Sequence, residues 1–171
     1  MPALKSTFRM IGTLTIRVRD ARTRRLLRTW SKRNTITYAA GDIVRSLMAQ
    51  RATDPAPAQY QFGSMRFGTD STPADRSQTD LISEVVGIRR ELNDAAKVDG
   101  ISGEITLEAT LEAGDGNGEI YREAGIFTLG AGAYDANQGG TLQMFARQVH
   151  PPLTKSSAII FDFSWTFQFT T

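Results

Sequence analysis

Residues that could carry out acid–base or nucleophilic chemistry are few in this chain of 171 residues. There is no cysteine, which excludes disulfides and thiolate metal sites, and there is one histidine, His150. A mechanism that needs an imidazole base therefore has a single candidate. His150 precedes Pro151 and Pro152, and a histidine in this context is typical of a turn. We interpret it as a turn residue rather than as a base.

Two carboxylates, Glu119 and Glu123, are the best candidate pair for glycoside hydrolysis, which needs two carboxyl groups about 5–9.5 Å apart. Strict alternation in a strand over 119–129 places Glu123 on the same face as Tyr121 and other large apolar residues. A buried carboxylate is costly unless it accepts hydrogen bonds or is paired. We therefore expect either a bulge at Gly125 or backbone N–H donors around Glu123, and we assign Glu123 a structural role.

Two loop motifs resemble ligand-binding loops only in part. Residues 115–118 read DGNG, like a fragment of a Ca²⁺ loop, but the remaining ligand positions and a terminal Glu are missing. Residues 68–73 hold one glycine and no following Lys-Ser/Thr, so they do not form a phosphate cradle. Turn chemistry explains both segments better. We expect a protein that is not an enzyme, without cofactor, metal or small-molecule substrate.

Charge is distributed unevenly along the chain. Residues 1–51 carry twelve Lys/Arg and two Asp/Glu, which gives a net charge of +10. Residues 52–171 carry eight Lys/Arg and sixteen Asp/Glu, which gives a net charge of −8. Such a chain can stack head to tail with copies of itself, or pair its two halves internally.

The densest positive patch lies at the tip of a predicted hairpin and comprises Arg22, Arg24, Arg25 and Arg28. Nucleic acid would contact such a patch through phosphates. However, there is no recognition-helix pattern and no basic stripe interleaved with aromatic residues. We therefore disfavour nucleic acid and favour a solvated or protein-facing hairpin.

Alternating patterns predict the elements that position these residues. The strongest covers 158–169, where Phe161, Phe163, Trp165 and Phe167 share one face, and we expect this strand to be the centre of the core. A strand from residue 8 returns through 26–30 as a basic N-terminal hairpin at about 8–30. An apolar stripe at helical spacing predicts one amphipathic helix at about 38–51, capped by Thr37.

Further strands are expected at 60–67, 82–92, 101–111, 119–129 and 142–149, the last ended by residues 150–152. A helical turn at 74–81, a polar connection at 93–100 and a surface loop at 130–140 lie between them. The chain is therefore predicted to be mainly β, one antiparallel β-sandwich or barrel-like domain over residues 1–171. No apolar run approaches the ~20 residues of a membrane-spanning helix, and no secretory signal is visible.

Six segments, taken in order, resemble the small tail and virion proteins of tailed bacteriophages. Residues 34–37 (NTIT), followed by the predicted helix, resemble their "N-x-I-t … la … L" opening. Residues 67–74 (FGTDSTPA) resemble "G-t-G-s-t-p-A", with Asp70 in place of a glycine, and 79–84 (TDLISE) resemble "D-T-x-L-x-x-E" with Thr and Asp exchanged. Residues 120–127 (IYREAGIF) resemble "i-x-E-a-G-L-f", residues 142–155 resemble "l-f-a-R … f-p-p-i-x-K", and the final strand resembles "l-x-i-x-W-x-i-x-f".

The resemblance implies a non-enzymatic baseplate, neck/collar or fibre-attachment subunit, located in the virion and assembled in the host cytoplasm. Its partners would be other virion proteins and copies of itself, without membrane or nucleic acid. The positions that it marks as fold residues are Asn34, Gly68, Thr79, Leu81, Glu123, Gly125 and Trp165. The expected contact residues are Arg22, Arg24, Arg25 and Arg28, with Tyr134 and Asp135 of the 130–140 loop. The alternative is a carbohydrate- or receptor-binding β-sandwich, for which Tyr60, Tyr134 and Trp30 are the candidate exposed aromatic residues.

Overall fold

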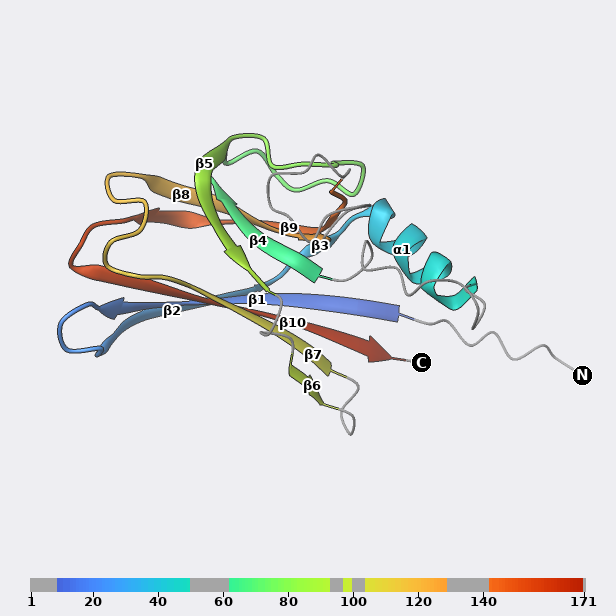
Figure 1. Cartoon of the computed structure of the whole chain (residues 1–171), viewed down its shortest axis with the longest axis horizontal. Coiled ribbons are helices and arrows are strands. Elements are labelled where there is room, and N and C mark those ends of the chain that lie inside the picture. The colour runs from blue at the N-terminus through green and yellow to red at the C-terminus, as the bar shows by residue number, and fades with distance from the viewer. Residues whose placement is uncertain (1–8, 50–61, 93–96, 100–103, 129–141, 171) are drawn as a thin grey trace, which may run out of the picture.

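Two antiparallel five-stranded sheets form the two layers of the protein (Figure 1). The structure is a computed structural model and describes residues 9–49, 62–92, 97–99, 104–128 and 142–170. The first sheet has the order β2-β1-β10-β7-β6 and the second the order β3-β9-β8-β4-β5. This confirms the predicted mainly β antiparallel sandwich with one helix.

The strands of the first sheet are β1 (Arg9–Asp20), β2 (Leu26–Arg33), β6 (Lys97–Asp99), β7 (Glu104–Leu111) and β10 (Ile159–Thr170). Those of the second sheet are β3 (Thr35–Ile36), β4 (Phe62–Gly68), β5 (Glu84–Glu91), β8 (Ile120–Thr128) and β9 (Met144–Thr154). The β1–β2 hairpin is present as predicted and projects at the left of Figure 1.

Strand β10 lies at the centre of the first sheet, between β1 and β7. Its side chains at 161, 163, 165 and 167 are all buried, and the three phenylalanines meet aromatic residues of the second sheet. The ring centroids of Phe67 and Phe163 are 4.6 Å apart, and those of Phe145 and Phe167 are 5.1 Å apart. The aromatic face that the alternating pattern predicted is therefore buried in the core, and its rings are not exposed as a surface on which a ligand could stack.

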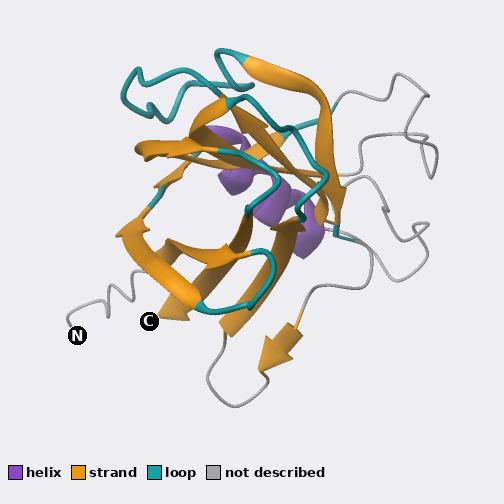
Figure 2. Ribbon diagram, turned by 90° about the vertical axis from the view of Figure 1, so that its left-hand side faces the viewer, coloured by secondary structure: helices purple, strands orange, loops and turns teal. Residues whose placement is uncertain are grey.

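Helix α1 (Tyr38–Ala49) lies at the end of the sandwich opposite the β1–β2 turn, and end-on it is seen between the two layers (Figures 1 and 2). Thr37 caps it as predicted, because its Oγ1 accepts a hydrogen bond from the Ala40 N–H at 3.3 Å. Ala40 and Ile43 are buried in the common core. No helix in the described part of the chain is long and apolar enough to cross a membrane.

Three local predictions were wrong. Residues 74–81 form turns and bends without a helical turn, and the predicted polar connection at 93–100 contains β6. Strand β9 does not end at His150 but continues through both prolines to Thr154.

A bulge explains how β9 tolerates its prolines. Glu123 of β8 pairs with Val149 and Tyr121 pairs with Leu153, so residues 150–152 stand opposite a single residue of β8. On its other side β9 pairs with β3 only at Arg147 and Ala146. The missing N–H groups of the prolines therefore break no bond between β9 and β3.

Candidate functional site

The two fully buried charges of the second sheet, Glu123 of β8 and Arg147 of β9, form an ion pair. Arg147 donates to Glu123 Oε2 through Nε at 2.7 Å, and its Nη2 lies 2.7 Å from the same oxygen. The backbone N–H of Ser83 donates to Glu123 Oε1 at 2.9 Å, and that of Ile82 donates to Oε2 at 3.4 Å. Backbone donors around Glu123 are thus confirmed, and they come from a segment 40 residues away.

Arg147 also holds the segment 69–83, which we call the clamped loop. Its Nη1 donates to the Thr72 carbonyl at 3.1 Å and to Gln78 Oε1 at 2.9 Å. Asp70 Oδ1 lies 4.0 Å from Arg147 Nη2, and hydrogen bonds from Thr72 hold the pKa of Asp70 below its usual value. One arginine therefore ties both the beginning and the middle of the clamped loop to the sheet.

A small second core lies beneath the clamped loop. It consists of Leu81, Phe127 and Met144, with Leu142 packed against it. Glu123 and Phe127 thus lie on the side of the sheet that faces the clamped loop, whereas Tyr121 packs against Phe67 and Phe161 in the main core.

The predicted placement of Tyr121 and Glu123 on one face was wrong, because the β8–β9 register shifts between them. A bulge reverses the alternation of side chains along a strand. The shifts lie at Tyr121/Glu123 and Ile126/Phe127 and not at Gly125.

Gly68 and Gly125 stand at positions where the fold leaves little room for a side chain, because neighbouring atoms approach their Cα atoms closely. A Cβ on Gly68 would lie 2.5 Å from the Ser83 carbonyl oxygen and would also collide with Glu123 Oε1. A Cβ on Gly125 would lie 3.0 Å from Leu81 Cδ2. The resemblance singled out both glycines, and each stands where the clamped loop meets the sheet.

We predict that Gly68→Ala lowers the free energy of unfolding by about 2 kcal/mol or more, because the obstacle is backbone and a buried carboxylate. The matched control is Gly41→Ala in α1, where a Cβ would meet nothing within 4 Å. That variant should gain roughly 0.5–1 kcal/mol from helix propensity. Urea unfolding followed by circular dichroism measures both, and equal stability of the two variants would contradict the close approach at Gly68.

The other predicted fold residues have different surroundings. Trp165 is buried at the centre of the core, and Leu81 is buried under the clamped loop. The side-chain amide of Asn34 lies against Gly12, and a Cβ on Gly12 would collide with it. Asn34 Nδ2 also donates a hydrogen bond to the Thr35 carbonyl at 3.3 Å. Thr79 is exposed. The structure therefore joins Gly68, Leu81, Glu123 and Gly125 at one place, with Thr79 on the exposed side of the clamped loop, and it leaves Asn34 and Trp165 elsewhere.

The structure separates the four arginines of the predicted basic tip. Asp20 organises the turn by accepting hydrogen bonds from the Thr23 N–H and Oγ1, each at 2.7 Å, and these bonds lower the pKa of Asp20. Arg22 and Arg25 are exposed at the turn. Arg24 has a φ of 58° and pairs with Glu112 at 3.1 Å. Part of the charge asymmetry is therefore satisfied within the chain, which the sequence left open.

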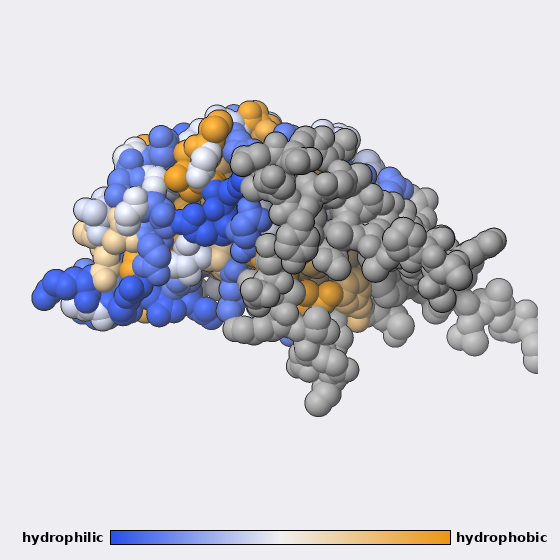
Figure 3. Space-filling model, viewed as in Figure 1, coloured by the Kyte–Doolittle hydropathy of each residue, from blue (hydrophilic) through white to orange (hydrophobic). Residues whose placement is uncertain are grey.

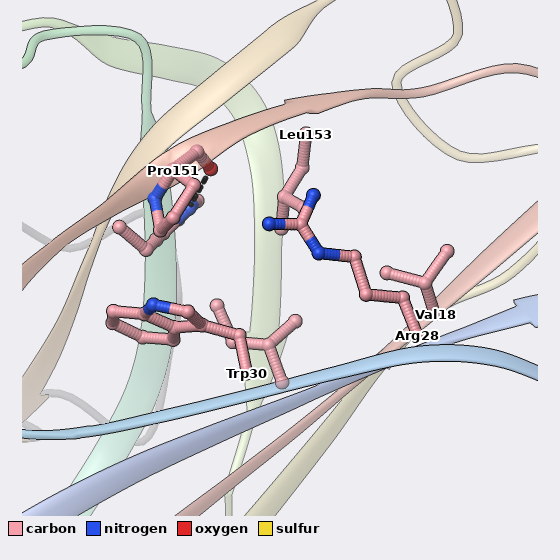
Figure 4. A pocket seen from close by; sticks show the side chains of 7 residues that line it. Val18, Arg28, Trp30, Pro151 and Leu153 are labelled. Atoms are coloured by element: carbon pink, nitrogen blue, oxygen red, sulfur yellow. Dashed lines mark hydrogen bonds between the residues drawn. The ribbon is translucent and has the colours of Figure 1, made fainter.

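Arg28 is exposed and also lines a narrow crevice between β2 and the bulged part of β9. The crevice is lined by Ile16, Val18, Arg28, Trp30, His150, Pro151 and Leu153. In Figure 4 Arg28 extends toward Leu153, and Trp30 faces Pro151. The space is too narrow for a water molecule. Trp30 packs edge-on against His150, with centroids 6.0 Å apart, so its ring is not presented as a sugar-binding platform.

His150 is a buried strand residue, and not the turn residue that we predicted. Its Nδ1 lies 2.9 Å from the Pro151 carbonyl oxygen, and burial lowers its pKa to about 4. The unfolded chain binds a proton on this imidazole near pH 6.5, whereas the folded protein does so only near pH 4. Acidification between these values therefore favours unfolding.

We predict that the contribution of His150 to stability is constant above about pH 6.5 and falls by on the order of 3 kcal/mol between there and pH 4. His150→Phe should remove this contribution while keeping an aromatic ring of similar size, and it should leave the loss below about pH 5 from carboxylates such as Asp20 and Asp70, whose pKa values are lowered in the folded protein. Urea midpoints measured at half-unit pH steps test this, and an unchanged slope in the variant would mean that other groups cause it.

Glu123 joins the sheet to the clamped loop, because its fully buried carboxylate pairs with Arg147 and accepts a hydrogen bond from the Ser83 N–H. The Glu123 carboxylate is therefore not exposed to solvent. In the part of the chain that the structure describes, no three His, Asp or Glu side chains gather as a metal site. Tyr134, Asp135 and Tyr60 lie outside the described residues.

Sequence reasoning missed the partner of Glu123. Part of the signal was present: Arg147 is a lone charge in the run MFARQV, and Glu123 follows Arg122 in a strand that is otherwise mostly apolar. Two opposite charges in two buried strands predict a pair, since neither is stable alone. No protein-family model, curated protein or solved structure significantly matches this chain.

Proposed function

We propose that this chain is a non-enzymatic structural subunit of a tailed-phage particle, in the tail, baseplate or neck/collar. It assembles as a multimer with other virion proteins and resides in the virion. The observation that carries the proposal is the convergence of the segments that resemble small phage virion proteins.

Four of those segments meet at the clamped loop. Gly68 belongs to the first, Leu81 and Ser83 to the second, Glu123 to the third and Arg147 to the fourth. They span 80 positions of the chain and are joined by the Glu123–Arg147 pair and the Ser83 hydrogen bond. Weak sequence signals that converge on one contact network support a shared structural unit more strongly than the same signals scattered over the surface.

The surface suits assembly by contact. The β1–β2 turn projects from one end with Arg22 and Arg25 exposed, and hydrophilic residues gather there in Figure 3. Hydrophobic residues gather over β5, an edge strand on which Val86 is 90% exposed. An exposed sheet edge with an apolar side chain is a common protein-contact feature.

The experiment is to purify phage particles from a culture that encodes the chain and to quantify its peptides by mass spectrometry. We expect a fixed copy number per particle that survives a wash at ~1 M salt, where exposed charge pairs are screened. A nonsense mutation in its gene should give normal DNA replication and lysis but particles that lack a part and do not infect. Particles without the chain, together with normal infectivity of the nonsense mutant, would overturn the proposal.

The receptor-binding alternative is not pursued as a second function. Of its three candidate aromatic residues, Trp30 is the one that the structure describes, and it is half-buried against His150.

A further inference from the structure

A buried lysine lies beneath the loop that connects β7 to β8. Lys155 directly follows β9 and is only 1% exposed, so its ammonium group is largely cut off from water. Its Nζ donates to Asn117 Oδ1 at 3.3 Å and to the Ser156 carbonyl at 3.0 Å, and both oxygens are neutral. Burial lowers the pKa of Lys155, and the charges of Asp115 and Glu112 offset only part of this effect. The fold therefore favours the neutral amine more than water does.

Backbone hydrogen bonds bring Lys155 and Asn117 together. Residues 112–119 connect β7 to β8 and residues 155–158 connect β9 to β10, so both connections pass from one sheet to the other. They lie at the same end of the sandwich, at the left of Figure 1. The Gly118 N–H donates to the Lys155 carbonyl at 3.0 Å, and the Lys155 N–H donates to the Glu119 carbonyl at 2.9 Å. The two side chains are thus neighbours because the backbone fixes them there.

The side-chain amide of Asn117 is held at both of its polar atoms. Its Nδ2 donates to the Ala113 carbonyl at 2.9 Å, while Oδ1 accepts from Lys155. Asp115 pairs with Arg90 of β5 and so braces the same loop against the second sheet. Asn117 is exposed, so a small molecule released from its amide can leave to solvent.

An amine and a carboxamide in this arrangement can react with each other. A neutral lysine amine is a nucleophile, and the Asn117 Cγ is bonded directly to the oxygen that Nζ already contacts. An amide is a poor acceptor between free molecules. Groups that are held together, however, react with effective molarities of about 10⁵–10⁸ M, which offsets the low reactivity.

We propose that Lys155 and Asn117 form an isopeptide bond in the folded protein. Nζ first gives one proton to solvent and then attacks the Asn117 Cγ, and the Nζ–Cγ bond forms as the Cγ–Nδ2 bond breaks. Nδ2 takes a second proton from Nζ and leaves as ammonia, which becomes ammonium by taking up the proton that solvent received. Nothing is oxidised or reduced and no further reactant is consumed. The product is a neutral amide, so the reaction removes a buried charge.

A competing reaction is open to Asn117, because glycine follows it in the sequence. The backbone nitrogen of such a glycine can attack the asparagine side chain and form a succinimide ring, again with release of ammonia. In this fold the Gly118 N–H is directed at the Lys155 carbonyl and is therefore turned away from this attack. The geometry thus favours Lys155 as the nucleophile, and the experiment has to separate two products of equal mass.

The bond joins two positions that are 38 residues apart in the chain. A crosslink between distant positions stabilises a protein mainly by restricting its unfolded state. The urea midpoint of the matured protein should therefore be higher than that of freshly folded protein. The crosslink does not depend on the proposed function, and the presence of the chain in purified particles is decided by its own measurement.

The test is the intact mass of the folded, full-length protein after incubation at mildly alkaline pH, where more of the amine is neutral. We expect most molecules to lose the mass of one ammonia. A tryptic digest should contain a branched peptide that joins the segment of Asn117 to the segment of Lys155. Protein kept in urea throughout should lack this peptide. An unchanged mass of the folded protein, or a loss of ammonia with linear peptides only, would overturn the proposal.

Three variants identify the reacting groups, with circular dichroism to confirm that each one folds. Lys155→Arg keeps the positive charge but removes the nucleophile, because a guanidinium stays protonated, and it should abolish the branched peptide. Asn117→Ala, at an exposed position, removes the acceptor carbon and should keep its full sequence mass. Lys32→Arg on the exposed strand β2 is the matched control and should form the crosslink as the wild type does. A branched peptide that persists in Lys155→Arg would mean that another amine reacts and that the assignment is wrong.

Discussion

Arg147→Met is expected to lower the free energy of unfolding by about 3–5 kcal/mol, because it leaves the Glu123 carboxylate buried without its counter-ion. The same change removes the donors to Thr72 and Gln78, so the clamped loop loses its attachment. This loss is a large part of the 5–15 kcal/mol that stabilises a typical domain. Urea unfolding measures the stability, and the rate of limited proteolysis within residues 69–83 measures the release of the loop.

Two further variants separate charge from packing. Glu123→Leu/Arg147→Met replaces the pair by apolar side chains and should recover most of the lost stability, since a buried pair often has little net advantage over apolar residues. It should still leave the clamped loop open to protease. Glu123→Gln should cost less than Arg147→Met, because an amide oxygen can still accept from Ser83 and Arg147 keeps Asp70 at 4.0 Å. If Arg147→Met lowered the free energy of unfolding by less than about 1 kcal/mol, the attachment of the clamped loop through Arg147 would be contradicted.

Trp165→Ala is expected to cost about 3–5 kcal/mol, because it empties the position of the largest fully buried side chain in the described core. The ring stacks on Phe167 with centroids 6.3 Å apart and lies in the central strand of its sheet. The core cluster that holds Trp165 has members from both sheets, which are anchored in their strands and cannot all move into the space. Thermal and urea unfolding measure the effect, and a loss of cooperativity would accompany it.

Trp165→Phe provides the comparison. No described group accepts a hydrogen bond from the indole N–H, so the smaller ring sacrifices no bond and relieves an unpaired donor. Its cost should stay below about 2 kcal/mol. Thr166→Ala, at the next residue of β10 and on its other side, should cost no more than about 1 kcal/mol, because it removes one part-buried hydroxyl bond to Thr106 and no core ring. If Phe proved as damaging as Ala at position 165, a bond from the indole nitrogen would have to exist.

Much of the fold could be predicted from local pattern. The alternation over 158–169 identified the central strand of the core and its buried face, because a strand exposes successive side chains on opposite sides. The cap at Thr37 and the start of α1 followed from spacing and residue type. The need of Glu123 for backbone donors followed from the cost of an unpaired buried charge.

The surroundings of the expected contact residues could not be read from the local pattern, and their role in contacts stays a prediction. All four arginines are exposed, but Arg24 also pairs with Glu112 and Arg28 also lines the crevice beside Trp30. Nothing in the local pattern distinguishes them, because the strand partner and the opposite sheet decide which side chains find a neighbour. The roles of Tyr134 and Asp135 stay predictions.

The sequence by itself determined where most of the strands lie, which face of the central strand β10 is apolar and which buried group requires a partner. These properties depend on neighbours within a few residues, where side-chain direction repeats with the period of the strand or helix. Tertiary structure alone decided that Arg147 is the partner of Glu123, that a bulge turns Tyr121 to the opposite side, and that β9 passes through its prolines. Those outcomes depend on the register between strands distant in the chain, and a one-residue shift in register reverses every side chain beyond it.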